Sequence, residues 1–408
     1  MLEDRKVYVY ISLEKQDIFV GTLWSHFRHG DETASFEYDK DWLANPNAFS
    51  LEPSLELFPG QYHTKHKLFG AIGDSAPDRW GRTLMRNNEI DMAKAEKRSP
   101  RTLNEIDYLL LVNDQTRQGA LRFKSDISGT FLSSSPTETV PPLVKLPELL
   151  SAAEKTSENK ATPAEIKLLL QPGSSLGGAR PKASVIDTDG TLCIAKFPKK
   201  DDNNNVVLWE GVALDLAKRA GIKTPEWKII TVANKKVIIL KRFDRQGEKR
   251  IPFLSAMSML GAEDGDDNKY SYLDIADALI EHGASTNEDL EELWRRIVFS
   301  IAISNTDDHL RNHGFLYTGQ QGWRLSPVYD VNPNPDSQGF LHTYISKVDN
   351  TADYDIALSV CENFRVKLKD AKEIINHVKG IVSNFAITAK RFNVSAAEIE
   401  RMSHLFKI

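Results

Sequence analysis

The chain has 408 residues, two to three times the ~100–200 residues of a typical domain, so several globular parts are expected. Hydrophobic residues make up 41% and charged residues 27%, with 23 Gly and 18 Pro, which excludes a disordered, collagen-like or low-complexity chain. Lysine and arginine number 52 against 57 aspartate and glutamate, a net charge of −5 that disfavours direct binding of nucleic acid.

Cysteine usage and the first residues bear on the cellular compartment. Cys193 and Cys361 lie far apart and form no CxxC pattern, so neither a disulfide framework nor a zinc site is indicated. The first six residues carry two acids where a signal peptide carries positive charge, and no apolar run reaches the ~18 residues of a membrane span. We therefore expect a soluble, cytoplasmic protein without a membrane partner.

The N-terminal part predicts a small α+β module over residues 1–125. Two β-branched and aromatic runs, 7–13 and 18–24, are separated by four polar residues, which indicates a hairpin. Residues 78–85 and 104–112 are more typical of helices. Residues 126–142 are rich in Ser, Thr and Pro and poor in large apolar side chains, so we place a linker there.

The middle part, residues 143–250, predicts a sheet with one inserted helix. A helix is expected near 146–154, and the glycines of 173–178 form a flap before the first strand. The remaining expected elements are strands at 183–186 and 192–197, an amphipathic helix at 206–220, and strands at 227–231 and 237–242.

The C-terminal part, residues 251–408, predicts a mostly helical lobe. An apolar stripe at three- and four-residue steps indicates a buried helix; it consists of Leu290, Leu293, Trp294, Ile297, Val298, Ile301 and Ala302. Polar residues 305–309 end that helix, and two short runs, 315–317 and 323–325, indicate a second hairpin. Residues 352–408 are typical of helices.

An aspartate and an asparagine after the buried helix have a spacing that suits phosphoryl transfer. Asp307 and Asn312 match the D-x-x-x-x-N spacing of a kinase catalytic loop, where the aspartate orients the attacking hydroxyl and the amide oxygen binds a metal ion. Asp330, after the second hairpin, would be the other ligand, because Mg²⁺ prefers oxygen ligands and takes few from protein. Alone, the pair matches many loops, and Asp330 also fits a plain turn.

Upstream residues could bind nucleotide phosphates. Lys196 lies among apolar neighbours in the expected strand 192–197, where a lysine can point at the α- and β-phosphates. Glu210, on the following helix, could pair with Lys196; a solvated lysine and a solvated glutamate are the alternative. The stretch 177–182 could present N–H groups or basic side chains to phosphate, although it matches neither GxGxxG nor GxxxxGK followed by Ser or Thr.

The order of these signals resembles the HipA family of toxin kinases. Four stretches carry the resemblance: SLGGARPK at 175–182, KRFDR at 241–245, NTDDHLRNHG at 305–314 and PVYDV at 327–331. The N-terminal module also resembles that family, through VGTL at 20–23, FEYD at 36–39 and GALRF at 119–123. The resemblance thus spans nearly the entire chain and implies a two-lobed, kinase-like core behind an N-terminal HipA-like module.

The resemblance also implies the activity and its cofactors. It implies a serine/threonine protein kinase that uses ATP and Mg²⁺, held inactive by a helix-turn-helix antitoxin of the HipB type and reaching operator DNA through that antitoxin. The family's best-known target is glutamyl-tRNA synthetase, an aminoacyl-tRNA synthetase. A small-molecule kinase on the same scaffold and a nucleotide-binding pseudokinase that acts as antitoxin corepressor are the alternatives.

Residue roles follow from motif position. The implied catalytic residues are Asp307, Lys196 and Asn312; the Mg²⁺ ligands are Asn312 and Asp330; the nucleotide-binding residues are Gly177, Gly178, Ala179, Lys182, Lys196, the adenine hinge from Lys241 to Phe243, His309 and Arg311; the self-phosphorylated residue is Ser175. His309 could instead brace the loop. Asp308 replaces a small residue, often Gly, and Arg180-Pro181 replaces Gln-Glu, so loop geometry and substrate choice are open.

Overall fold

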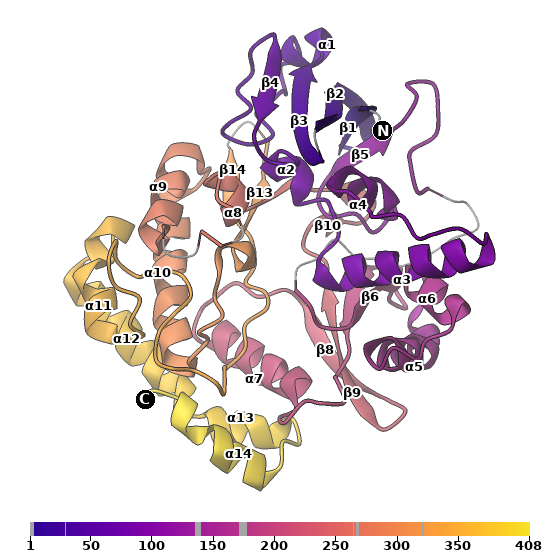
Figure 1. Ribbon diagram of the computed structural model, residues 1–408. Helices are drawn as coiled ribbons and strands as arrows, with labels where there is room; N and C mark the ends of the chain where they lie inside the picture. Colours follow the sequence, from indigo (N-terminus) through magenta and orange to yellow (C-terminus); the bar gives the residue numbers. More distant parts are fainter. Residues whose placement is uncertain are drawn as a thin grey trace. The chain divides into compact units, whose positions relative to one another are not determined.

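The computed structural model describes residues 4–28, 30–134, 140–170, 178–263, 265–266, 269–319 and 322–408, and Figure 1 shows their helices and strands. Helices alternate with small sheets, which confirms the predicted α+β class. The chain divides into two compact units, residues 1–200 with 231–254, and residues 201–230 with 255–408. Among the helices of the described residues, none combines the length and apolar character needed to cross a membrane.

The first unit begins with a five-stranded sheet in the order β4-β3-β2-β1-β5. Its strands are β1 (Arg5–Leu13), β2 (Gln16–Arg28), β3 (Asp31–Tyr38), β4 (Gln61–Thr64) and β5 (Leu121–Lys124). The expected hairpin is confirmed as the antiparallel pair β1–β2, whose turn places Glu14 and Lys15 at positive φ. A Cβ at Gly21 would lie 2.2 Å from the carbonyl oxygen of Glu37, so this motif position requires glycine.

Along the chain, the helices of the first unit lie between β3 and the first strand of a second sheet. They are α1 (Lys40–Leu43), α2 (Gly70–Gly73), α3 (Arg79–Ala95), α4 (Glu105–Leu111), α5 (Leu146–Ser157) and α6 (Pro163–Leu170). The helices expected at 78–85, 104–112 and 146–154 are therefore confirmed. Leu170 of α6 packs against a buried cluster from α3 and α4, so the segments before and after residue 140 share one core; the cluster consists of Met85, Leu103, Tyr108 and Val112.

The second sheet has the order β6-β7-β9-β8. Its strands are β6 (Lys182–Ile186), β7 (Leu192–Lys196), β8 (Trp227–Val232) and β9 (Lys235–Lys241), as expected from the sequence. Lys196 faces Lys182 on one side of β7 and Ile238 on the other. Two short strands follow, β10 (Arg245–Gln246) and β11 (Lys249–Arg250). One of the boundaries between the two units, that between residues 230 and 231, falls inside β8.

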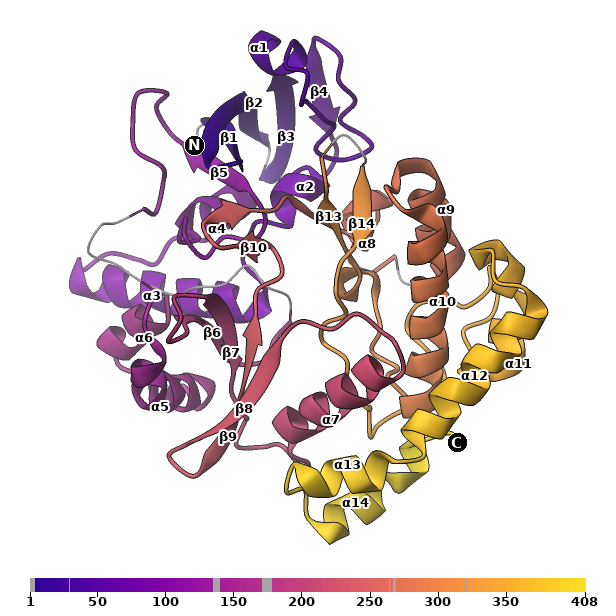
Figure 2. The ribbon, with the colours of Figure 1, turned by 180° about the vertical axis from the view of Figure 1, so that it is seen from behind.

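The second unit is built around α10 (Thr286–Ile303), and the predicted apolar stripe on this helix is fully buried. In Figure 2, α11 and α12 run beside α10. The other elements of this unit are α7 (Val206–Arg219), α8 (Ala256–Met259), α9 (Tyr272–His282), β13 (Gly314–Tyr317), β14 (Trp323–Leu325), α11 (Tyr354–Ser359), α12 (Leu368–Val382), α13 (Phe385–Arg391) and α14 (Ala396–Met402). Strands β13 and β14 form the expected second hairpin. The short strand β12 (Phe253–Ser255) lies where the chain passes from the first unit to the second.

Candidate active site

The candidate catalytic loop leaves α10 through a left-handed residue. Ser304 has φ 52° and ψ 44°, and its N–H bonds to the carbonyls of Ser300 and Ile301, which ends the helix. The Ser304 hydroxyl donates to the carbonyl of Leu405 at 2.7 Å, and the N–H of Asn334 donates to the Ser304 carbonyl at 3.0 Å. The start of the loop is thus fixed by segments that follow it in the chain.

The two neighbouring aspartates of this loop have opposite environments. Asp307 is exposed, whereas Asp308 is buried. The main-chain carbonyl of Asp307 accepts the N–H of His309 at 3.0 Å and the side-chain Nδ2 of Asn312 at 3.0 Å. The structure therefore brings Asp307 and Asn312 together through a direct hydrogen bond, and it leaves the Asp307 carboxylate accessible.

Asp308 supports the loop from inside the second unit. Its carboxylate accepts the hydroxyls of Tyr272 at 2.5 Å and Ser300 at 3.1 Å, and its Oδ1 lies 3.2 Å from Nε2 of His313, outside hydrogen-bond geometry. Its carbonyl accepts the Thr343 hydroxyl at 2.7 Å. Burial raises the pKa of Asp308, but His313 and the two hydroxyl donors outweigh burial and hold this pKa below its ordinary value. The acid that departs from the family pattern is therefore a structural anchor.

The segment around Asp330, residues 329–332, is hydrogen-bonded to the candidate catalytic loop. The hydroxyl of Tyr329 donates to the carbonyl of Arg311 at 2.7 Å, and the N–H of Asn332 donates to Oδ1 of Asn305 at 3.3 Å. Asp330 itself has φ 56°, a left-handed conformation that costs a non-glycine residue ~1–2 kcal/mol. This conformation occurs at functional sites and also in turns, so it agrees with both interpretations of Asp330.

One predicted nucleotide-binding residue of the first unit, Lys182, belongs to a buried ion pair. Lys182 on β6 lies 2.7 Å from Asp78, the N-cap of α3, and both side chains are 2% exposed. Nε1 of Trp80 donates to the Lys182 carbonyl at 3.0 Å. This burial favours a role for Lys182 in anchoring the stem of the glycine-rich stretch to α3, over contact with a phosphate.

The remaining predicted residues are distributed over both units. Lys196 is half-buried at the end of β7, and Lys241 and Phe243 are half-buried at and after the end of β9. Glu210 is buried on α7 of the second unit. Gly178 and Ala179 belong to the first unit, and the half-buried His309 and exposed Arg311 belong to the catalytic loop. Ser175 and Gly177 lie outside the described residues.

Sequence reasoning missed the partners that hold the site in place. Tyr272 lies 36 positions before Asp308, and Asp78 lies 104 positions before Lys182, so no local pattern links them. The one feature of the sequence that pointed to Asp308 was that it replaces the small residue, often Gly, found at this position in the family that the chain resembles. These partners are found only when the chain is folded.

Comparison with known proteins identifies two family domains in this chain. The HipA N-terminal domain model matches residues 12–123, and the HipA-like C-terminal domain model matches residues 174–385. A solved structure of the Shewanella oneidensis toxin–antitoxin system HipA and HipB with its operator DNA has a TM-score of 0.68 and 18% identity, and the alignment covers 98% of this chain and 94% of that one. At this identity the likeness establishes the fold, and it confirms the predicted HipA-like architecture.

Two curated relatives match smaller parts of the chain. A Haemophilus influenzae protein named "Putative kinase" is 25% identical over 199 residues, 42% of this chain and 57% of that protein. A Sinorhizobium fredii protein named "Putative kinase Y4dM" is 28% identical over 156 residues, 35% of this chain and 37% of that protein. The matched region thus spans less than two thirds of either relative.

Proposed function

This chain belongs to the HipA family, and we propose that it is an ATP-dependent kinase that phosphorylates a serine or threonine of a protein substrate. The observation that carries the proposal is the pairing of Asp307 with Asn312. The Asp307 carboxylate is exposed, while its own carbonyl is held by the Asn312 amide. An accessible carboxylate on a fixed loop can orient a substrate hydroxyl and accept its proton.

The donor atoms in the second unit suit Mg²⁺. The Asn312 amide nitrogen is committed to the main chain, so the amide oxygen is the atom that a cation would meet. Together with the Asp330 carboxylate this makes a set of oxygen ligands, and Mg²⁺ is typically held by one or two carboxylates plus phosphates and water. The described residues hold no group of three or more His, Cys, Asp or Glu side chains placed around one metal. When bound, Mg²⁺ would neutralise the charge of the ATP phosphates.

The chain's own residues would act by position and charge. Asp307 would orient the hydroxyl for in-line attack and hold its proton. Lys196 would bind the α- and β-phosphates, and Gly178 and Ala179 would offer main-chain N–H groups to the phosphates. Lys241 to Phe243 would receive the adenine.

The test is phosphate transfer by the purified chain. We expect transfer from radiolabelled ATP with Mg²⁺ to a protein in a bacterial lysate, and a loss of at least ~10²-fold in Asp307→Asn and in Asp330→Ala, the usual scale of general acid–base effects. Asp277→Asn, an exposed carboxylate on α9, is the matched control and should keep full activity. Labelling of small molecules alone, or near-normal transfer by Asp307→Asn, would contradict the proposal.

We further propose that a helix-turn-helix antitoxin is the partner of this chain and carries it to operator DNA. The proposal draws on the Shewanella neighbour, which was solved with HipB and operator DNA. It also agrees with the net charge of −5, which gives the chain little attraction of its own for DNA. Gel shifts with and without a HipB-type helix-turn-helix protein test it: a shift only with both proteins is expected, and tight, salt-sensitive binding by this chain alone would contradict it.

A further inference from the structure

A buried charge network in the first unit joins two segments that are far apart in the sequence. One is the loop 113–119, which precedes β5; the other is the hinge segment 241–245, which ends β9. Arg242 is 2% exposed, and its guanidinium donates to the carbonyls of Thr116 and Arg117, the latter at 3.2 Å. Its Nε also donates to Oδ1 of Asp244 at 2.7 Å. Arg242 therefore ties the hinge segment directly to the main chain of the loop.

Asp244 and Arg245 complete this connection. The Asp244 carboxylate accepts the N–H of Gly119 at 2.8 Å and Nη1 of Arg245 at 2.8 Å. Arg245 in turn donates to the carbonyls of Gly119 at 3.0 Å and Arg117 at 2.6 Å. Burial raises the pKa of Asp244, but the charges of Arg242 and Arg245 outweigh it and hold this pKa far below its ordinary value. The network is therefore charged at neutral pH.

Gly119, the last residue of the loop, lets the main chain pass close to Phe253, the first residue of β12. It has φ +72°, and a Cβ at this position would lie 3.2 Å from the main-chain nitrogen of Phe253. Glycine adopts that conformation without steric cost.

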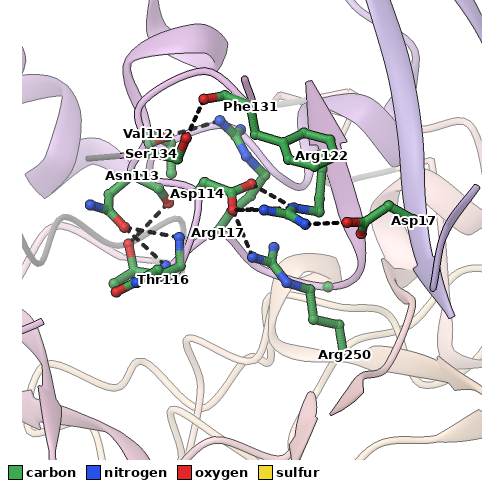
Figure 3. Close-up of polar contacts among 12 residues, drawn as sticks. Asp17, Val112, Asn113, Asp114, Thr116, Arg117, Arg122, Phe131, Ser134 and Arg250 are labelled. Carbon is green, nitrogen blue, oxygen red and sulfur yellow. Dashed lines mark hydrogen bonds and ion pairs between the residues drawn. The ribbon is translucent and has the colours of Figure 1, made fainter. Parts of the chain in front are cut away.

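A second group of charged side chains, centred on Asp114, also holds the loop 113–119. Figure 3 shows Asp114 between Arg122 and Arg250. Asp114 accepts Arg122 through both carboxylate oxygens and Arg250 Nη2 at 3.0 Å. Arg117 points the opposite way and donates to the carbonyls of Leu109 and Val112, each at 2.9 Å. The loop is thus bonded at both ends and cannot shift without breaking charge-assisted hydrogen bonds.

Burial alternates along the hinge segment. Arg242 and Asp244 are buried in the network, while Lys241 and Phe243 are half-buried. Strand β9 ends at Lys241, and residues 242–244 form the coil and turn before β10, so the buried side chains that contact the loop and the half-buried ones assigned to the nucleotide share one short stretch of main chain. A shift of Arg242 must therefore move both.

We infer that the loop 113–119 and its partners Arg242, Asp244 and Arg245 position the hinge segment, so that the N-terminal module sets the nucleotide affinity of the kinase. The loop belongs to the part matched by the N-terminal domain model, and the hinge segment to the part matched by the C-terminal one. The inference rests on the proposed function, because it takes residues 241–243 as the adenine hinge. In it, the buried guanidinium of Arg242 is a positioning group that contacts the loop, and only the main chain of this residue belongs to the adenine hinge.

The test uses the full chain and a fluorescent ATP analogue. Arg242→Lys keeps the charge but loses the planar fork, and we expect at least ~10-fold weaker binding and a matching rise in KM for ATP, with kcat changed less than ~2-fold. Arg245→Lys should weaken binding by a smaller factor. Arg98→Lys is the control, since Arg98 pairs with the buried Glu89 in the same unit; it should lower thermal stability and leave binding unchanged. A folded Arg242→Lys chain with wild-type affinity would overturn the inference.

Hydrogen exchange of the unaltered chain gives a second readout that needs no variant. Coupling between two sites is reciprocal, so a bound non-hydrolysable ATP analogue should slow exchange in the peptide that covers 113–120. Unchanged exchange there, with the analogue bound, would overturn the inference. If the unaltered chain binds the analogue but transfers no phosphate, only the proposed function is rejected. If the unaltered chain transfers phosphate and Arg242→Lys binds the analogue with unchanged affinity, only the positioning role is rejected.

Discussion

Replacing Tyr272 by Phe removes the hydroxyl that donates a hydrogen bond to Asp308 of the candidate catalytic loop and keeps the aromatic ring. The Tyr272 hydroxyl is fully buried and donates to the Asp308 carboxylate at 2.5 Å. A hydrogen bond to a charged group contributes ~1.5–3 kcal/mol, and the carboxylate keeps its Ser300 donor, so we expect Tyr272→Phe to lower the free energy of unfolding by about 2 kcal/mol.

The assay is urea unfolding at pH 7, with the change in free energy taken from the midpoint at constant slope. Tyr354→Phe is the matched control in the same unit, because its hydroxyl donates to a neutral carbonyl, that of Lys407, at 2.6 Å. It should cost only ~1 kcal/mol. In a double-mutant cycle, Tyr272→Phe and Asp308→Asn should show a coupling energy of at least ~1 kcal/mol. A loss below ~0.5 kcal/mol, or strict additivity, would refute the reasoning.

Two further outcomes are expected from buried charges of the structure, and a third from the family resemblance. Lys182→Met should lower the free energy of unfolding by ~3–5 kcal/mol, because it leaves the buried carboxylate of Asp78 without its cation, and adding Asp78→Asn should restore part of this; a loss of ATP affinity at unchanged stability would instead favour a phosphate contact. The pKa of Asp308 is lowered in the folded chain, so the stabilisation from its ionised carboxylate is present above the ordinary carboxyl pKa and is lost as the pH falls through the pKa of the folded state. The stability of Asp308→Asn should therefore depend less on acid pH than that of the unaltered chain. Identical acid titrations of the two chains would contradict this. Mass spectrometry after incubation with ATP and Mg²⁺ should find phosphate on Ser175 of the active chain and none in Asp307→Asn, and phosphate at equal levels in both would exclude self-phosphorylation.

Local patterns in the sequence determined the elements of this fold. The hairpin at the N-terminus and the stripe of α10 were predictable because side-chain periodicity reports directly on which face is buried. The spacing of Asp307 and Asn312 predicted a catalytic loop, and in the structure the Asn312 amide donates to the Asp307 carbonyl at 3.0 Å. Family motifs added the order of these features along the chain.

The tertiary structure decided which of two adjacent acids faces solvent. The motif spacing singles out Asp307 but says nothing of burial; only the fold brings Tyr272 and Ser300 against Asp308 and leaves Asp307 exposed. The same holds for Lys182, whose position beside the glycines predicts a phosphate contact, whereas only the fold shows that Asp78 lies 2.7 Å from its ammonium group. Partners separated by tens of residues leave no periodic signal, and a buried charge depends on those partners, so only the tertiary structure shows which of these ionisable residues are buried and what they contact.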